Sequence, residues 1–345
     1  MKMAKAKYTA IGGQALIEGI MMKSPEKTAL AVRKKDGSID ISSLDGKSLR
    51  EKYRILRLPI IRGIIGFAES LIGGYKALMK SAEISGFADL EDEKKKKGET
   101  EEEKKETKEK ESSGAFMAVI GVVASILGVA IAIVLFMAVP TYIVQGITYL
   151  FNGGKAFSPI VTSSIEQFIK LVIFVIYIWA VSLMNDIKRV YMYHGAEHKT
   201  IFCYEKGLPL TVENVREQRR FHPRCGTSFM ILMILVSILI STATQLIFPG
   251  VYGVKWLWIT VKILLIPLTC GVGFEVLRAC GKYDNALTRI ISAPGLWLQR
   301  ITTKDPDDSM LEIAIAALKA CEPKVPDVDR SVENENGEEN GENSI

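Results

Sequence analysis

Long hydrophobic segments alternate with polar, charge-rich segments along this chain. Four segments are apolar over roughly 20 residues, the length that an α-helix needs to cross a bilayer: 115–139, 168–184, 227–248 and 256–277. The last one contains Lys262, Pro267 and Glu275 and fits the pattern least well. The pattern predicts an α-helical membrane protein with about four transmembrane helices.

Lysine and arginine are distributed unevenly among the segments that connect these four. Segment 185–226, between the second and third, contains eight of them, whereas segment 140–167 contains only Lys155 and the turn before the fourth contains only Lys255. Short cytoplasmic segments carry an excess of cations. We therefore expect a multi-pass protein of the plasma membrane with both termini and the 185–226 loop in the cytoplasm.

Residues 1–88 have the pattern of a small α+β cytoplasmic module. Segment 28–43 alternates around Asp36-Gly37, which is typical of a β-hairpin because glycine supplies the positive φ of a tight turn. Segment 59–85 has apolar residues at helical spacing, interrupted by glycines and charges. It is expected to lie on the membrane surface or to pack against the transmembrane helices, and its entry into the membrane stays open.

The rest of the chain divides by composition. Segment 89–114 is a charged low-complexity linker, 115–322 is the four-helix membrane domain, and 323–345 is an acidic tail predicted to be disordered. The net charge of +5 is small and indicates no nucleic-acid partner. The five cysteines include no CxxC pair, so reduced thiols are expected.

The strongest chemical signal is the motif YHGAEHK at residues 193–199. On a helix His194 and His198 lie one turn apart on the same face, and Glu197 shares that face. In metalloproteases with the His-x-x-Glu-His spacing, two histidines bind zinc and the glutamate is the general base. The third and last histidine of the chain, His222, lies in the same loop.

The predicted topology brings these residues together. The helix of the second span is expected to continue through His194, and His222 precedes the third span, so antiparallel packing would join them. Cys225 lies where Thr227 or Ser228 is expected to cap that third helix, and a helix start lowers a thiol pKa. Zinc suits a set of three histidines with a cysteine as alternative or fourth ligand: His194, His198, His222 and Cys225. The third ligand stays open, because downstream carboxylates are also available: Glu205, Glu213 and Glu217.

Other interpretations of these residues remain. A histidine near a membrane is usually a hydrogen-bonding or interfacial residue. Glu275 could be a ligand, a proton carrier or the partner of an arginine, and the arginine pair is the commonest outcome. The glycines of Ile11-Gly12-Gly13-Gln14 fit a packed turn better than a phosphate loop, because no Gly-Lys-Ser/Thr follows.

The segments GGQALIEGIMMKSP, RGIIGFAESLIGGYKAL, YHGAEHKTIFCYE and HPRCGTSF together resemble the YqhQ-like family. The family consists of bacterial membrane proteins that are described as predicted metal-dependent enzymes. The resemblance extends from about Tyr8 to Leu318 and excludes the charged linker and the tail. It implies a bacterial inner membrane location and adds Gln14 and Glu18 to the candidate site residues.

These observations favour a metal-dependent membrane enzyme, with hydrolysis at the cytoplasmic face as the expected reaction and Glu197 as general base. Membrane lipid is the expected environment, a lipid or membrane peptide the expected substrate, and a second copy or another membrane protein a further partner. The alternative is a non-enzymatic assembly or scaffold protein with a structural metal site. A small transporter that uses Lys262 and Glu275 ranks third.

Overall fold

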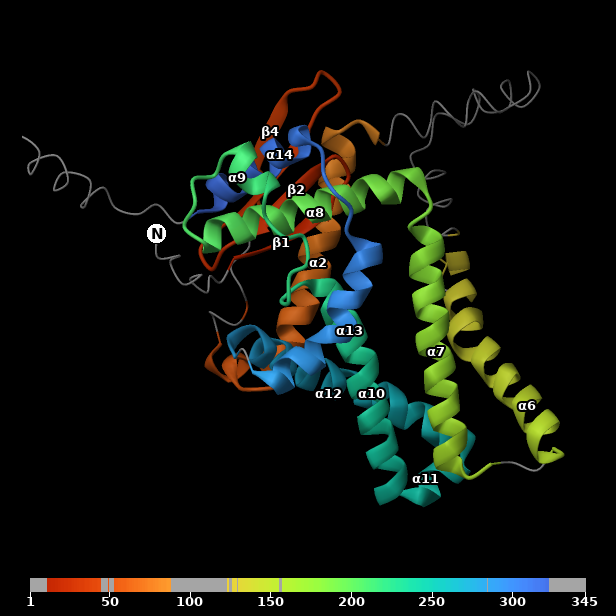
Figure 1. Cartoon of the computed structure of the whole chain (residues 1–345). Helices are drawn as coiled ribbons and strands as arrows, with labels where there is room; N and C mark the ends of the chain where they lie inside the picture. The colour runs from red at the N-terminus through yellow and green to blue at the C-terminus, as the bar shows by residue number, and fades with distance from the viewer. Residues whose placement is uncertain are drawn as a thin grey trace, which may run out of the picture.

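The computed structural model describes residues 11–44, 49, 53–87, 123, 126–128, 130–154, 157–283 and 285–322. The described part is mostly helical, with one small antiparallel sheet at its N-terminal end (Figure 1). The linker 89–114, the tail 323–345 and the beginning of the first predicted span lie outside the described residues.

The sheet has four strands in sequential order, β1 (Gly12–Leu16), β2 (Gly19–Lys23), β3 (Thr28–Arg33) and β4 (Ile39–Ser43). Strands β3 and β4 pair antiparallel, with Arg33 opposite Ile39. Gly37 in their connection has a φ of 85°, a conformation that glycine adopts without strain. The hairpin predicted around Asp36-Gly37 is confirmed.

Each face of the sheet is covered by helices. Because strand side chains alternate, Ile20, Met22 and Ala31 face one side and pack on α14 (Asp308–Cys321) and α8 (Asn185–Glu205). Leu30 and Val32 face the other side and pack on Ala77 of α2 (Ile61–Ile84). The sheet core is therefore completed by helices from the middle and the end of the chain.

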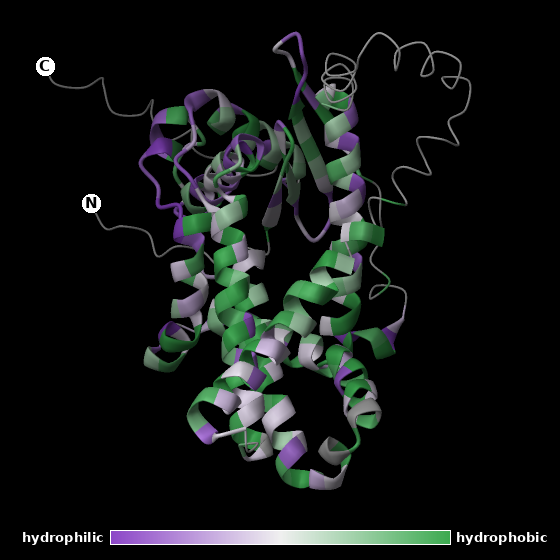
Figure 2. Ribbon diagram, turned by 90° about the vertical axis from the view of Figure 1, so that its right-hand side faces the viewer, coloured by the Kyte–Doolittle hydropathy of each residue, from purple (hydrophilic) through white to green (hydrophobic). Residues whose placement is uncertain are grey.

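Four described helices are long and apolar enough to cross a membrane, and they include the following segments: α6 (Val139–Asn152), α7 (Pro159–Val181), α10 (Gly226–Ile247) and α12 (Lys255–Lys282). Hydrophobic positions predominate along them, and polar positions gather around the layer that carries the sheet (Figure 2).

Two of these helices differ in extent from the prediction. The first continues beyond Pro140 to Asn152, and the π-helical turn η2 (Val134–Ala138) ends two residues before that proline. The second begins at Pro159, because the Ser158 side chain accepts a hydrogen bond from the Val161 N–H and proline fits the first helical position. The segment predicted as an outer loop is therefore largely helical. The short helix α11 (Pro249–Gly253) joins α10 to α12.

Helix α8 is a separate element, so the prediction that the second span continues into the histidine motif is wrong. The chain turns at residues 182–184, where Ser182 and Leu183 close the end of α7 through hydrogen bonds to Ile178 and Ala180. Asp186 then lies in the first turn of α8, where a negative charge is favourable. As a result α8 runs across the end of α7 instead of extending it (Figure 1).

Helix α2 connects the sheet to the apolar helices, as the prediction that it packs against them requires. At its beginning Gly63 lies against Phe274 of α12, where a Cβ atom would be 2.8 Å from the Phe274 Cβ. Beside this contact the Arg62 Nε donates to Glu275 Oε1 at 2.6 Å, and a second guanidinium nitrogen bonds Oε2. Of the roles considered for Glu275, the structure shows the ion pair with an arginine.

Removing one partner of this pair tests its contribution. Arg62→Met leaves the partly buried Glu275 carboxylate without its donor, so the free energy of unfolding is expected to fall by about 1–3 kcal/mol. The double variant Arg62→Met/Glu275→Met is expected to recover most of that loss, because no unpaired charge remains. Thermal denaturation in detergent micelles measures both, and equal losses in the two variants would contradict the assignment.

Candidate metal site

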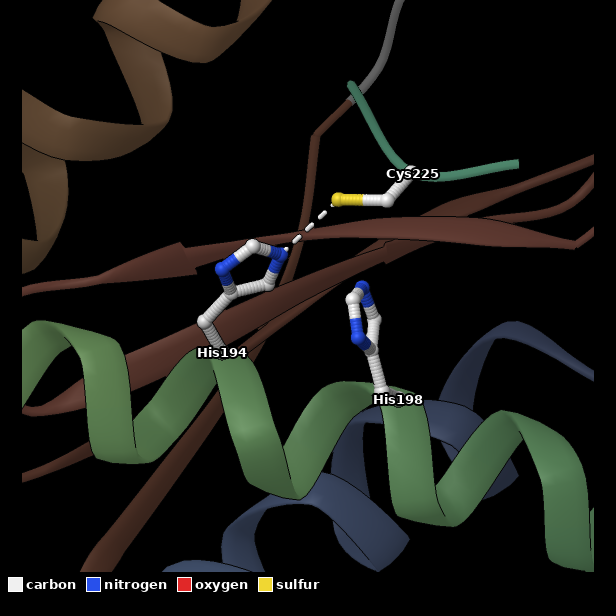
Figure 3. A group of neighbouring side chains, drawn as sticks. All are labelled: His194, His198 and Cys225. Atoms are coloured by element: carbon white, nitrogen blue, oxygen red, sulfur yellow. Dashed lines mark hydrogen bonds between the residues drawn. The ribbon is translucent and has the colours of Figure 1, made fainter. Parts of the chain in front are cut away.

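The histidine motif of α8 meets the beginning of α10. His194 and His198 lie on successive turns of α8, and their ring centroids are 4.4 Å apart. Cys225, at the N-cap of α10, points at them from the opposite side (Figure 3). One potential ligand atom from each of these three residues lies within 4.8 Å of the other two. The group is buried.

Backbone carbonyls orient both imidazoles. His194 Nδ1 lies 2.8 Å from the Thr302 carbonyl oxygen, and His198 Nδ1 bonds the Arg220 carbonyl oxygen. A carbonyl only accepts hydrogen bonds, so each Nδ1 carries a proton and each Nε2 is the nitrogen left for another partner. This is the arrangement by which proteins fix the tautomer of a metal-binding histidine.

The two Nε2 atoms have different surroundings. His194 Nε2 lies 3.0 Å from the Cys225 sulfur. His198 Nε2 is buried and has no hydrogen-bond partner among the residues that the structure describes. A buried nitrogen with an unused lone pair is costly unless something binds it. This atom lies with His194 and Cys225 where all three could share one ligand.

The charges of the group reinforce one another. Burial lowers the pKa of the His194 imidazole, but the adjacent Cys225 thiolate outweighs burial and raises that pKa to about 9. Burial raises the pKa of the Cys225 thiol, yet the two imidazoles hold it well below its usual value. A thiolate is the form in which cysteine binds metals and acts as a nucleophile.

Cys225 also begins α10, a role that the sequence had assigned to Thr227 or Ser228. Its sulfur accepts a hydrogen bond from the Thr227 N–H at 3.4 Å. The positive end of the helix therefore adds to the stabilisation of the thiolate.

Glu197 lies on the side of α8 that faces the sheet and is buried. A Cβ atom on Gly13 of β1 would be 2.9 Å from the Glu197 Cγ and Cδ atoms, so the carboxyl group fits only because β1 has glycine there. Burial raises the pKa of Glu197, and the charges of His194 and His198 oppose that shift. The carboxylate is thus held close to the group as a neighbour of its three residues.

His222 lies next to the group and turns its nitrogens elsewhere. Its ring centroid is 5.6 Å from that of His198. Its Nδ1 accepts from the Arg224 N–H at 3.3 Å, and its Nε2 lies 3.7 Å from Glu205 Oε2. Cys225, and not His222, therefore provides the third atom of the compact group.

Glu205 is one of the three carboxylates considered as a further ligand, and it belongs to this neighbouring cluster. Burial raises the pKa of Glu205, but hydrogen bonds from His222 and Arg224 outweigh burial and lower it to about 2. Glu213 and Glu217 are exposed and lie outside the group of three.

Gln14 and Glu18 connect the sheet to neighbouring helices through side-chain hydrogen bonds. The Arg189 guanidinium binds the Glu18 carboxylate, and the Tyr193 hydroxyl donates to it at 3.0 Å. Gln14 Nε2 donates to the Gly74 carbonyl of α2 at 3.4 Å. Among the described residues, neither side chain is part of the ligand group.

The sequence interpretation missed the residues that hold the site from α13 (Ala286–Thr302) and the segment after it. Gln299 is fully buried, accepts from the His222 N–H at 2.7 Å and donates to the His222 carbonyl at 2.8 Å. The Thr302 carbonyl oxygen accepts from His194 Nδ1. The Lys304 N–H donates to the Tyr191 carbonyl oxygen at 2.8 Å. The available signal was Gly195, a glycine between two candidate ligands on a helix.

The absence of a side chain at Gly195 is required by this packing. A Cβ atom there would overlap the Lys304 carbonyl oxygen. Gly195→Ala is expected to push the 302–304 segment away from α8 and to lower the free energy of unfolding by about 1–3 kcal/mol. Thermal denaturation measures this loss. Gly146→Ala on α6 is the control, because nothing lies within 4 Å of its Cβ position; equal behaviour of the two variants would contradict the assignment.

Comparison with known proteins identifies the family of the chain. The family model described as "Protein of unknown function (DUF1385)" matches residues 58–324. The chain is 36% identical to "Uncharacterized protein YqhQ" of Bacillus subtilis (strain 168) over 307 residues, which is 89% of this chain and 90% of that protein. No solved structure matches. The chain therefore belongs to the DUF1385 family of YqhQ-like proteins.

Proposed function

We propose that this protein is a zinc-dependent membrane hydrolase whose metal is held by His194, His198 and Cys225. The observation that supports this most directly is the unused lone pair of the buried His198 Nε2, beside His194 Nε2 and the Cys225 thiolate. Two imidazoles and one thiolate form a donor set that zinc prefers. Three protein ligands also leave a fourth position for water, which is the pattern of catalytic zinc sites.

Glu197 is the proposed general base. A bound zinc ion supplies a nucleophile by lowering the pKa of a coordinated water to near 7. The Glu197 carboxyl group lies on the helical turn between the two histidines, and its charge interacts with all three members of the group. Its raised pKa suits a residue that accepts a proton and later returns it.

The proposed substrate is a lipid or a membrane peptide. Cys225 directly precedes α10, one of the helices that is long and apolar enough to span a bilayer, so the group would lie at the membrane surface. The surplus of cations in segment 185–226 favours the cytoplasmic side of a bacterial plasma membrane, with both termini there. A substrate anchored in the inner leaflet would reach this position.

Two other interpretations use the same residues. The 3.0 Å contact between His194 Nε2 and the Cys225 sulfur also fits a cysteine nucleophile with a histidine partner. We favour metal binding because a Cys–His pair needs only one imidazole, whereas both imidazoles act on the Cys225 thiol and His198 Nε2 makes no hydrogen bond among the described residues. A scaffold protein with a structural metal would keep the ligands but would not need the carboxyl group of Glu197.

Metal content tests the ligand set. Purified protein is expected to contain about one zinc ion per chain, as a His₂Cys site implies. His198→Ala and Cys225→Ala each remove a ligand. Each is expected to weaken zinc affinity by more than the roughly 10–100-fold loss that follows when only a hydrogen-bond partner of a ligand is changed. Cys203→Ala is the matched control, since Cys203 is a buried thiol outside the group. Elemental analysis after dialysis measures the content, and zinc that persists in both ligand variants would refute the proposal.

Glu197→Gln separates an enzyme from a scaffold. The variant is expected to keep its metal and its melting temperature, because glutamine has the same shape, and to lose hydrolysis, because an amide is a poor base. Mass spectrometry of lipids and peptides that copurify with it should reveal a species that accumulates relative to wild type. His198→Ala is the metal-free control. Identical profiles for Glu197→Gln and wild type would favour the scaffold.

A further inference from the structure

The beginning of α2 lies beside the apolar helices, well away from the sheet. The rings of Phe67 and Phe229 have centroids 5.5 Å apart, and Phe229 is in the first turn of α10. Further toward the start of α2, Ile60 packs so closely on Gly271 of α12 that a Cβ atom on that glycine would overlap it. Both partner residues belong to segments long and apolar enough to span a membrane. Figure 1 shows α2 reaching from the sheet down to α12.

The chain approaches Ile60 from the same side to which α2 returns. The Leu49 N–H donates to the Glu69 carboxylate at 2.7 Å, which places Leu49 two turns along α2 from its beginning. The chain then passes through η1 (Arg54–Arg57) to Ile60, where it reverses with a φ of 70°. Residues 61–69 span about 12 Å of helix, far less than the roughly 30 Å of a hydrocarbon core.

The surface of this segment is apolar. The exposed fractions are 64% for Ile55 and 51% for Leu58, and Leu71 and Ile72 farther along α2 are also exposed. Exposed apolar side chains of this size are typical of an interaction surface. The same kind of surface continues on α12, where Leu264 is 71% exposed.

Polar groups of the segment are compatible with hydrocarbon. Backbone donors bond within it, from Leu56 to Tyr53 and from Leu58 to Ile55, as a bilayer interior requires. Arg62 is neutralised by Glu275 on α12. Arg54 and Arg57 have side chains long enough to extend toward headgroup phosphates.

We propose that residues 53–69 form a re-entrant segment that enters the bilayer from the side of the sheet, turns at Ile60 against α12 and returns to the same side. Its occupant is lipid hydrocarbon, which contacts Ile55 and Leu58. The inference rests on the membrane placement proposed above. It adds to the four candidate spans a further segment in contact with the bilayer, and α2 connects this segment directly to the sheet.

Spin labels on variants that each add one cysteine test this placement in the full-length protein. Ile55→Cys and Leu58→Cys are reconstituted into vesicles of phosphatidylethanolamine and phosphatidylglycerol, and collision with oxygen is compared with collision with a water-soluble nickel chelate. Leu264→Cys on α12 is the lipid control, and Ser38→Cys in the exposed hairpin turn is the aqueous control. The native cysteines are buried, and labelled wild type gives their background.

The expected result is an oxygen-to-nickel ratio at positions 55 and 58 that matches position 264 and exceeds position 38 several-fold. Nickel access at 55 and 58 with position 264 shielded would overturn the re-entrant segment alone. Shielding of 55 and 58 from both reagents would also overturn it, because a protein surface such as a second copy would then cover them. Nickel access at position 264 would remove the membrane placement itself, and the inference would fall with it.

Discussion

The candidate site depends on two hydrogen bonds from imidazole Nδ1 atoms to backbone carbonyls. One carbonyl belongs to Thr302 at the end of α13, and the other belongs to Arg220 in the connection before α10. Neither segment is a neighbour of α8 in the sequence. The Nε2 atoms of His194 and His198 face Cys225 only if both segments are in place, so the site forms together with the tertiary structure and not with α8 alone.

Close packing of glycines makes this arrangement possible. Gly13 gives the Glu197 side chain room against the sheet, and Gly195 lets the Lys304 carbonyl reach α8. On the opposite side of the sheet Gly74 leaves room for Gln14. These three contacts bring the backbone of the sheet and of its helices close to the buried polar group, where charges interact more strongly than in water.

Local patterns predicted much of this molecule, because they report local structure. The spacing of apolar residues predicted the four long helices and the helix α2, and Asp36-Gly37 predicted the hairpin. The spacing of His194 and His198 identified the centre of the site. The turn at residues 182–184 contains neither glycine nor proline, so nothing in its pattern announced the end of α7.

Long-range partners could not be predicted from the sequence. Glu275 binds Arg62 across 213 residues, and the His222 backbone is held by Gln299 across 77 residues. Cys225 belongs to the compact group and His222 does not, because the nitrogens of His222 contact Arg224 and Glu205 instead. Such choices depend on which side chains the tertiary structure brings together.

Helix α13 carries a mechanical consequence. Its middle is pressed on α10 through Gly295 and Ser228, and its last turn presents the carbonyl that orients His194. A shift of α13 along α10 would therefore move that carbonyl, which is the acceptor that fixes the His194 ring. The orientation of one imidazole of the site thus follows the packing of two helices other than its own.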